Sequence, residues 1–186
     1  TSVDSTTVFV NQPMTTDAGL DTTICNGQVV VIGGNPTATG GSGTYTYQWS
    51  PSTFLNTGTA ANPSANPSGN VTYFVTATDG NGCTASDFMT ITVRPNPTAF
   101  AGADKDLYLC PGDSVIIGDI PAAIGGLAPY TYSWSPSTGI VTSTSLANPV
   151  VKGLATAQTY VLLVTDANGC SATDAVTVYV RPNNLT

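Results

Sequence analysis

Short stretches in which apolar and polar residues alternate run along the whole chain. Tyr45, Tyr47 and Trp49 alternate with polar residues, and residues 130–134 repeat the same alternation. A period of two places every second side chain on one face, which is typical of a half-buried β-strand. Other segments rich in β-branched residues are 28–32, 73–78, 84–93 and 115–117. Gly, Pro and Asn separate these segments, so the pattern predicts an all-β protein built of short strands.

The order of these segments occurs twice. Residues 25–33 match residues 110–118, and residues 45–53 match residues 130–138 at the same offset. Segments 61–63 and 79–83 reappear as 147–149 and 166–170. Because each copy holds several short strands bounded by turns, the sequence predicts two tandem β-sandwich domains.

The limits of the copies follow from their last strands. Each copy ends in a Thr- and Val-rich strand followed by Arg-Pro, and a similar segment, 7–10, precedes the first copy. We therefore expect residues 1–13 to hold the last strand of a preceding repeat, residues 14–97 the first repeat and residues 98–186 the second. Two prolines in the connection 94–100 predict a stiff spacer. We interpret the chain as a segment of a longer array.

Each copy carries two cysteines, which flank its single tryptophan. Because their positions are equivalent, we expect one disulfide inside each copy, Cys25–Cys83 and Cys110–Cys170. Such a bridge would stabilise a domain by about 4 kcal/mol if chain entropy alone is counted. Metal-bound thiolates are the alternative, but the sequence has no CxxC motif and no histidine to complete a site. Disulfides imply an oxidising, extracellular compartment.

Charged residues are scarce and mostly acidic. The chain has 4 Lys+Arg against 11 acidic residues, all of them Asp, and its net charge is -7. Nucleic acids and anionic membranes bind clusters of Lys or Arg, so neither is expected as a partner. No apolar run approaches the roughly 18 residues of a membrane-spanning helix, so no membrane insertion is expected. Because histidine, Glu and a phosphate-binding loop are all missing from the sequence, we do not expect an enzyme.

Aromatic and acidic side chains are the remaining candidates for binding. Trp49 and Trp134 could stack on sugars, but on strands of alternating aromatics we interpret them as core residues. Calcium is the one cofactor that the sequence suggests, because Asp and Asn oxygens stand on Gly-containing turns and near the start of each copy. The candidate ligands are Asp79, Asn81, Asp166, Asn168, Asp21 and Asp104. The same residues can instead form the turns, with no cofactor at all.

One loop differs in character between the copies. Segment 36–44 is polar, whereas its counterpart 121–129 carries Ala122, Ile124 and Leu127 in place of Thr37, Thr39 and Ser42. Apolar groups on a surface loop usually mark a contact site, here a lateral contact with a like chain. The alternative is that this loop folds against its own or a neighbouring domain.

Several short motifs follow one another along the chain. They are Ala18-Gly19-Leu20-Asp21, Cys-x-Gly, Thr-Tyr-x-Trp-Ser-Pro-Ser-Thr, Asn-Pro and Thr-Asp-x-Asn-Gly-Cys. In this order they resemble the PKD-like, SprB-type tandem repeats of large gliding-motility and surface adhesins, which the type IX secretion system of Bacteroidota exports. The resemblance implies that the chain holds two tandem Ig-like (PKD-like) β-sandwich domains, which are repeated along cell-surface filaments. It also raises O-glycosylation at Asp-Ser/Thr motifs, which occur at residues 4–6, 21–23 and 113–115.

These observations predict a non-catalytic structural or adhesive segment of a large, repetitive extracellular surface filament or adhesin. The expected partners are like chains, neighbouring repeats, surface glycans or other cells. The alternative is an accessory module of a secreted multidomain enzyme, for example a carbohydrate-binding β-sandwich. Many further repeats in the neighbouring sequence would favour the filament, whereas a catalytic domain would favour the module.

Overall fold

The structure, a computed structural model, describes residues 4, 12–108 and 112–182. The described residues form β-strands and loops, and none of them belongs to a helix long and apolar enough to cross a membrane. The chain divides into two compact units, Thr1–Val93 and Arg94–Thr186. The predicted all-β, Ig-like fold is confirmed. The strand expected at residues 7–10 lies outside the described residues.

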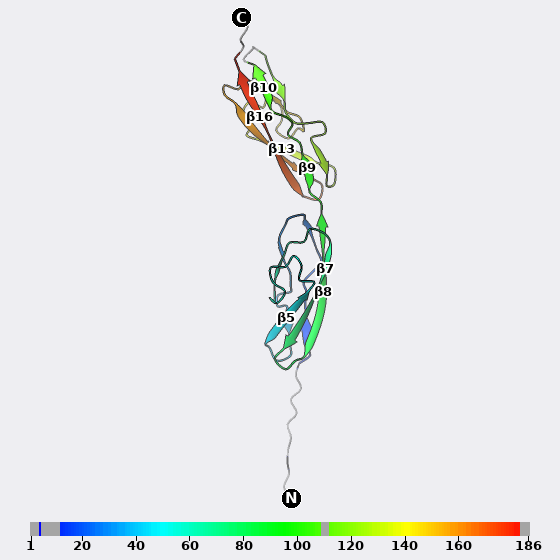
Figure 1. The fold of residues 1–186 in the computed structure, drawn as a ribbon. Coiled ribbons are helices and arrows are strands. Elements are labelled where there is room, and N and C mark those ends of the chain that lie inside the picture. Colours follow the sequence, from blue (N-terminus) through cyan, green and yellow to red (C-terminus); the bar gives the residue numbers. More distant parts are fainter. Residues whose placement is uncertain (1–3, 5–11, 109–111, 183–186) are drawn as a thin grey trace. The chain divides into compact units, whose positions relative to one another are not determined.

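The first unit is built around a sheet of four strands in the order β2-β8-β7-β5 (Figure 1). These strands are β2 (Thr22–Cys25), β5 (Tyr45–Ser50), β7 (Val71–Asp79) and β8 (Thr84–Arg94). Two short strand pairs complete the unit: β1 (Thr15–Thr16) with β4 (Ala38–Thr39), and β3 (Val30–Val31) with β6 (Ser64–Ala65). The longest antiparallel pair, β7 with β8, is closed by the Asp79–Cys83 turn that the Asn-Gly sequence predicts.

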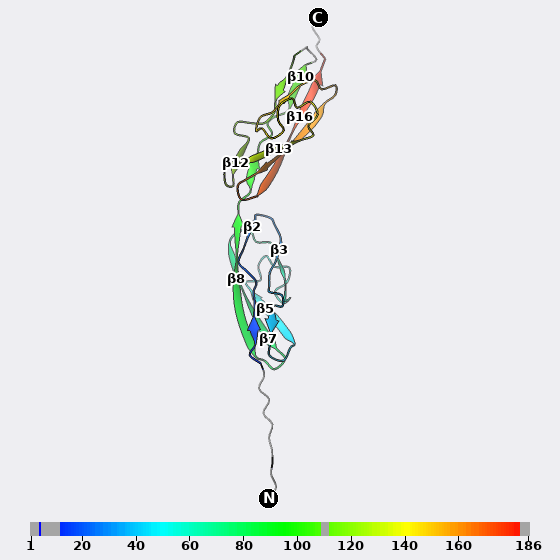
Figure 2. The same ribbon diagram turned by 180° about the vertical axis from the view of Figure 1, so that it is seen from behind.

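The second unit repeats this topology. Its main sheet has the order β10-β16-β15-β13 (Figure 2). The strands are β10 (Lys105–Tyr108), β13 (Thr131–Ser135), β15 (Gln158–Thr165) and β16 (Ser171–Arg181). The short pairs are β9 (Pro97–Ala99) with β12 (Ala123–Gly125), and β11 (Val115–Ile116) with β14 (Val150–Val151). Pro97, which the sequence assigns to the end of the first repeat, therefore pairs with Gly125 of the second unit.

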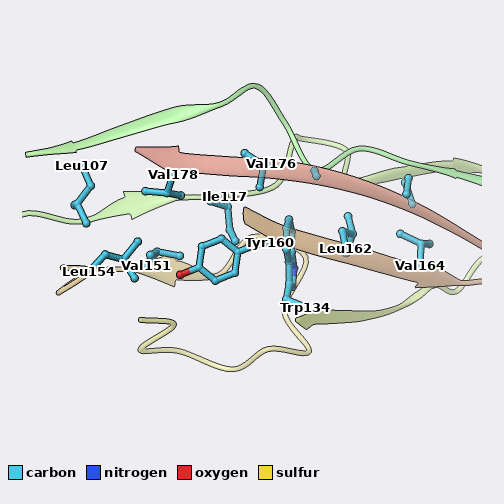
Figure 3. Packing of buried hydrophobic residues seen from close by; sticks show 13 residues of the cluster. Leu107, Ile117, Trp134, Val151, Leu154, Tyr160, Leu162, Val164, Val176 and Val178 are labelled. Atoms are coloured by element: carbon cyan, nitrogen blue, oxygen red, sulfur yellow. The ribbon is translucent and has the colours of Figure 1, made fainter. Parts of the chain in front are cut away.

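Each unit encloses its own apolar core. Trp49 is 1% exposed and packs among the buried side chains of the first unit. Trp134 is 3% exposed and packs among buried aliphatic side chains of the second unit (Figure 3). The indole Nε1 of Trp49 donates to the Ala60 carbonyl at 2.9 Å, and that of Trp134 donates to the Leu146 carbonyl at 3.0 Å. Because the indole N–H is satisfied inside the fold, burial leaves no polar atom of either tryptophan without a partner.

Candidate functional site

The cysteines are the first place where the structure departs from the sequence prediction. Cys83 is an exposed, free thiol, so the expected Cys25–Cys83 bond is wrong. Cys25 and Cys170 each take part in a disulfide bond, and the Cys110–Cys170 bond stays a prediction. Cys110 itself lies outside the described residues.

The length of β8 explains why Cys25 and Cys83 do not meet. Cys83 directly precedes β8 at Thr84. Asp21, just before β2, accepts the Thr90 N–H at 2.7 Å, and β2 lies along the C-terminal half of β8 (Figure 2). The ends of an 11-residue strand are roughly 33 Å apart, whereas disulfide-bonded cysteines have Cα atoms within about 7 Å. The sequence shows that each copy has two cysteines in equivalent positions. It does not show that Cys25 and Cys83 lie near opposite ends of β8.

The Asp79 carboxylate organises the turn between β7 and β8. Its Oδ1 accepts the N–H groups of Asn81 at 2.9 Å and Cys83 at 2.8 Å, and its Oδ2 accepts the Ser42 N–H at 2.9 Å. Burial acts to raise the pKa of this carboxyl group, but the backbone hydrogen bonds lower it, and the net pKa lies below its ordinary value of 3.8. Asp79 therefore joins the turn to the loop at residue 42.

Asp166 has the same role in the second unit. It accepts the N–H groups of Asn168, Cys170 and Leu127, each at 2.9 Å. Burial raises its pKa, and these hydrogen bonds lower it to a net value below the ordinary one. The carboxylates proposed as calcium ligands thus accept backbone N–H groups.

The other two Asp residues among the calcium candidates link segments of the main sheets. Asp21 accepts the Thr90 N–H at 2.7 Å, and Asp104 accepts the Thr177 N–H at 2.8 Å. Within residues 4, 12–108 and 112–182, no group of three or more His, Cys, Asp or Glu side chains could hold a metal ion. These hydrogen bonds fit the alternative in which the same residues form turns and strand links, and the calcium sites stay a prediction.

The loop that turns apolar in the second unit is partly buried and partly exposed. Ala122 is only 3% exposed, so its predicted place in a surface contact is wrong. Ile124 and Leu127 are 49% and 50% exposed. The Leu127 carbonyl accepts the Ala167 N–H at 2.8 Å, so the loop backbone packs on its own domain while two side chains face solvent.

An open depression beside this loop extends the apolar surface. Its lining residues are Phe100, Asp119, Ile120, Pro121 and Ile124. Ile120 is 92% exposed. The matching depression of the first unit has Asp17, Asn35 and Thr39 where the second has Phe100, Ile120 and Ile124. The sequence prediction of the contact did not include Phe100 and Ile120. Aligning the two copies shows that they replace the polar residues Asp17 and Asn35.

A pair of aromatic rings stands on the outer face of the first unit. Phe74 of β7 and Phe88 of β8 are directly opposite each other, with ring centroids 5.7 Å apart. They are 54% and 59% exposed. The strand alternation predicts that they point away from the core, but exposed phenylalanines are an unusual choice for a face otherwise rich in threonine.

Comparison with known proteins finds similar folds but does not show a family. No family model matches the chain. Over 125 residues it is 32% identical to the dyslexia-associated protein KIAA0319-like protein of Mus musculus, covering 62% of this chain and 12% of that protein. The chain thus spans only a small part of this relative.

Solved structures of similar fold are Ig- and PKD-like. A SusE-like, surface-located polysaccharide-binding protein from the heparin utilisation locus of Bacteroides thetaiotaomicron matches with a TM-score of 0.50 and 17% identity. That match covers 93% of this chain and 35% of the other. The PKD domain of the KIAA 1837 protein matches with a TM-score of 0.40 and 24% identity, over 47% of this chain and 89% of the domain.

Proposed function

We propose that the chain is a non-catalytic structural and adhesive segment of a large, repetitive extracellular filament or adhesin. The observation that carries this proposal is the tandem repetition of one sandwich, with the same strand order and the same Asp-centred turn in both units. The described acidic side chains that could have served chemistry accept backbone hydrogen bonds instead. A repeated fold whose polar groups are used internally suits a mechanical or spacing role.

The finer assignment to SprB-type repeats exported by type IX secretion is supported by the ordered motifs alone. The disulfide is consistent with an extracellular, oxidising location. Sequencing the full reading frame tests the assignment, because an SprB-type protein must contain many further copies of the motif set. A single catalytic domain beside these two units would contradict it.

Lateral association of like chains is the interaction that we assign to the filament. The exposed side chains of Ile120 and Ile124 and the half-buried Phe100 form an apolar patch on the second unit, where the first unit has polar residues. A small patch on each of many repeats can produce strong association by avidity without any large single interface. The low content of charged residues, 8%, limits electrostatic repulsion between aligned chains.

Sedimentation velocity of the full chain tests this contact. Replacing Ile120 and Ile124 with Asp should weaken self-association about tenfold or more, because charges would have to be desolvated in the contact. The melting temperature should stay nearly unchanged, since both side chains are exposed. The matched control is Asn35→Asp with Thr39→Asp in the first unit, which should leave association unaltered. Equal association of both variants would contradict the lateral contact.

A glycan-binding module is the second candidate, and the exposed Phe74–Phe88 pair is the observation that favours it. Aromatic faces on a flat sheet can stack on sugar rings. Calorimetric titration with acidic and neutral oligosaccharides should then give heat that Phe74→Ala abolishes. The control is Val161→Ala, which truncates an exposed residue of β15 in the second unit. Absence of binding by the unaltered chain would remove this candidate.

A further inference from the structure

The outer face of the main sheet in the first unit carries an aromatic pair between two pairs of hydroxyl groups. Strands β5, β7 and β8 lie side by side in this sheet (Figure 1). Phe74 and Phe88 are directly opposite each other, and their ring centroids are 5.7 Å apart. We propose that this face binds a single chain of neutral pyranose sugars, which stacks on the phenylalanines and bonds to the flanking hydroxyl groups. The inference deepens the glycan-binding candidate and rests on it, because both use the same aromatic pair.

A pair of hydrogen-bonded hydroxyl groups stands on each side of the two rings. On one side, Thr72 Oγ1 and Thr90 Oγ1 are 3.0 Å apart. On the other side, Thr76 Oγ1 and Ser86 Oγ are 2.9 Å apart. Residues two positions apart on a strand share one face and are about 6.8 Å apart, so each hydroxyl pair is the direct neighbour of the rings.

Rings between hydroxyl groups match the two kinds of surface that a sugar has. The C–H groups of a pyranose ring form an apolar face that stacks on an aromatic ring, and the sugar hydroxyl groups surround this face. The hydrogen bond within each protein hydroxyl pair uses one hydrogen atom, so a second O–H donor and further oxygen lone pairs remain for a ligand. A lipid or an apolar peptide segment would cover these hydroxyl groups without bonding to them, which costs free energy.

The charge of this face matches an uncharged ligand. Before Arg94, which belongs to the second unit, the side chains that β5, β7 and β8 place on it are those of Thr, Ser, Gln and Phe. Asp87 of β8 faces the other way, because its Oδ2 accepts the Ala18 N–H at 2.8 Å. The net charge of the chain, -7, repels the carboxylate and sulfate groups of acidic sugar chains, which bind clusters of Lys or Arg. A neutral chain therefore complements this face better than an acidic one.

The tilt of the rings favours a single sugar chain over the flat surface of a crystalline polysaccharide. The ring planes of Phe74 and Phe88 make an angle of 40°. Two rings at this angle cannot both lie flat against one plane, whereas a single chain can stack on one ring and meet the edge of the other. On the neighbouring strand β5, the exposed residues Ser50 and Gln48 are opposite Phe74 and Thr76. A chain that continues over β5 therefore meets a further hydroxyl group and an amide group.

The second unit lacks this site, although its strands have the same order. Val161 and Ala175 are opposite each other where the first unit has the two phenylalanines. One flanking hydroxyl pair is kept, with the Oγ1 atoms of Thr159 and Thr177 3.0 Å apart, whereas Leu163 replaces the threonine of the other. We therefore expect one sugar site per chain, and the second unit supplies matched controls.

Affinity electrophoresis of the full chain in native gels tests the proposal. The gels contain dextran, hydroxyethyl cellulose, galactomannan, arabinoxylan or glycol chitin as neutral polysaccharides, and heparin or alginate as acidic ones. We expect at least one neutral polysaccharide to retard the chain and neither acidic one to do so. Phe74→Ala should lower the association constant about tenfold or more, because truncating a central aromatic residue of a contact has effects of this size. The matched control, Val161→Ala, should leave it unchanged.

Removing hydroxyl groups separates a sugar site from a merely apolar surface. Thr72→Val with Thr76→Val removes one hydroxyl group on each side of the rings and keeps the branched shape of the side chains. Sugar binding should then weaken about threefold or more, because hydrogen bonds to the ligand are lost. The control is Thr159→Val with Thr173→Val on the equivalent face of the second unit. Unchanged or stronger binding by the Thr72 and Thr76 variant would mark a non-specific apolar surface and overturn the proposal.

The remaining outcomes separate this inference from the functions on which it rests. Retardation by heparin or alginate that Phe74→Ala abolishes would overturn the neutral ligand and leave the glycan-binding candidate standing. Pull-down by insoluble crystalline cellulose without retardation by any soluble chain would overturn the single chain in the same way. Binding of no polysaccharide would remove both. Circular dichroism verifies that each variant is folded, and Phe88→Ala is measured if Phe74→Ala is not. The association test at Ile120 and Ile124 changes neither phenylalanine, so failure of the filament contact is seen independently.

Discussion

Gly33 is a position where the fold leaves little room for a side chain, and Gly33→Ala should destabilise the first unit. The residue has a φ of +98°, and a Cβ atom there would lie 2.6 Å from the Ala61 carbonyl oxygen. It would also lie 2.7 Å from Asn62 Nδ2 and 2.9 Å from Thr37 Oγ1. A left-handed backbone costs an L-residue about 1–2 kcal/mol. Overpacking against neighbouring backbone adds about 1–3 kcal/mol, so the total expected loss is about 2–5 kcal/mol.

Gly27→Ala separates the two contributions. Gly27 has nearly the same φ, +86°, but a Cβ atom there would meet nothing within 4 Å. It should therefore lose only the backbone contribution of about 1–2 kcal/mol. Differential scanning calorimetry measures both variants, and hydrogen exchange of first-unit peptides assigns the transition. Equal losses for Gly27→Ala and Gly33→Ala would refute the close approach of residues 33 and 61.

Three further outcomes follow from buried polar groups of the first unit. Thr37→Val should lower the free energy of unfolding, measured in urea, by about 1–3 kcal/mol. The reason is that the Thr37 hydroxyl donates to the carbonyls of Gly34 (3.0 Å) and Ala61 (3.1 Å), and an unchanged midpoint would contradict those bonds. Asp79→Ala should speed amide exchange at residues 42, 81 and 83, whose N–H groups lose their acceptor, and unchanged protection would contradict that role. Because the folded pKa of Asp79 lies below 3.8, the unfolded chain binds more protons as pH falls. The stability from this group should be complete above pH 3.8 and lost as pH falls through the folded pKa, so a urea midpoint that does not change between pH 5 and 2 would contradict it.

Local alternation and internal repetition were enough to predict most of the fold. Tyr45, Tyr47 and Trp49 lie on β5, and Trp49 is buried while its polar neighbours Gln48 and Ser50 are exposed. The Asn-Gly turn closes β7 and β8 as predicted. The parallel pairing of β10 with β16 could not be predicted in this way, since the two strands are the first and last of the main sheet and no local signal sets their register.

The candidate sites were harder to predict because they depend on distances between segments. Equivalence of the cysteines was visible in the sequence, but only the length of β8 shows that Cys25 and Cys83 stand at its opposite ends. Replacement of Thr37 by Ala122 suggests a more apolar surface, whereas both residues are buried, at 2% and 3% exposure. Sequence position within a loop does not reveal which side chains turn inward. Ala122 is 3% exposed, whereas Ile124, two residues later, is 49% exposed.

The absence of Glu from the sequence follows from how the carboxylates are used. Asp87 accepts the Ala18 N–H and Asp174 accepts the Ala101 N–H, both at 2.8 Å, in equivalent positions of the two units. Asp21, Asp79, Asp104 and Asp166 likewise accept backbone N–H groups. A carboxylate that must reach a backbone N–H close to its own strand or turn needs a short side chain with few rotamers, because each additional rotatable bond has to be ordered at an entropic cost. Asp meets this need in edge links and hairpin turns alike. In the fold these six Asp side chains accept hydrogen bonds from backbone N–H groups of turns, loops and strands.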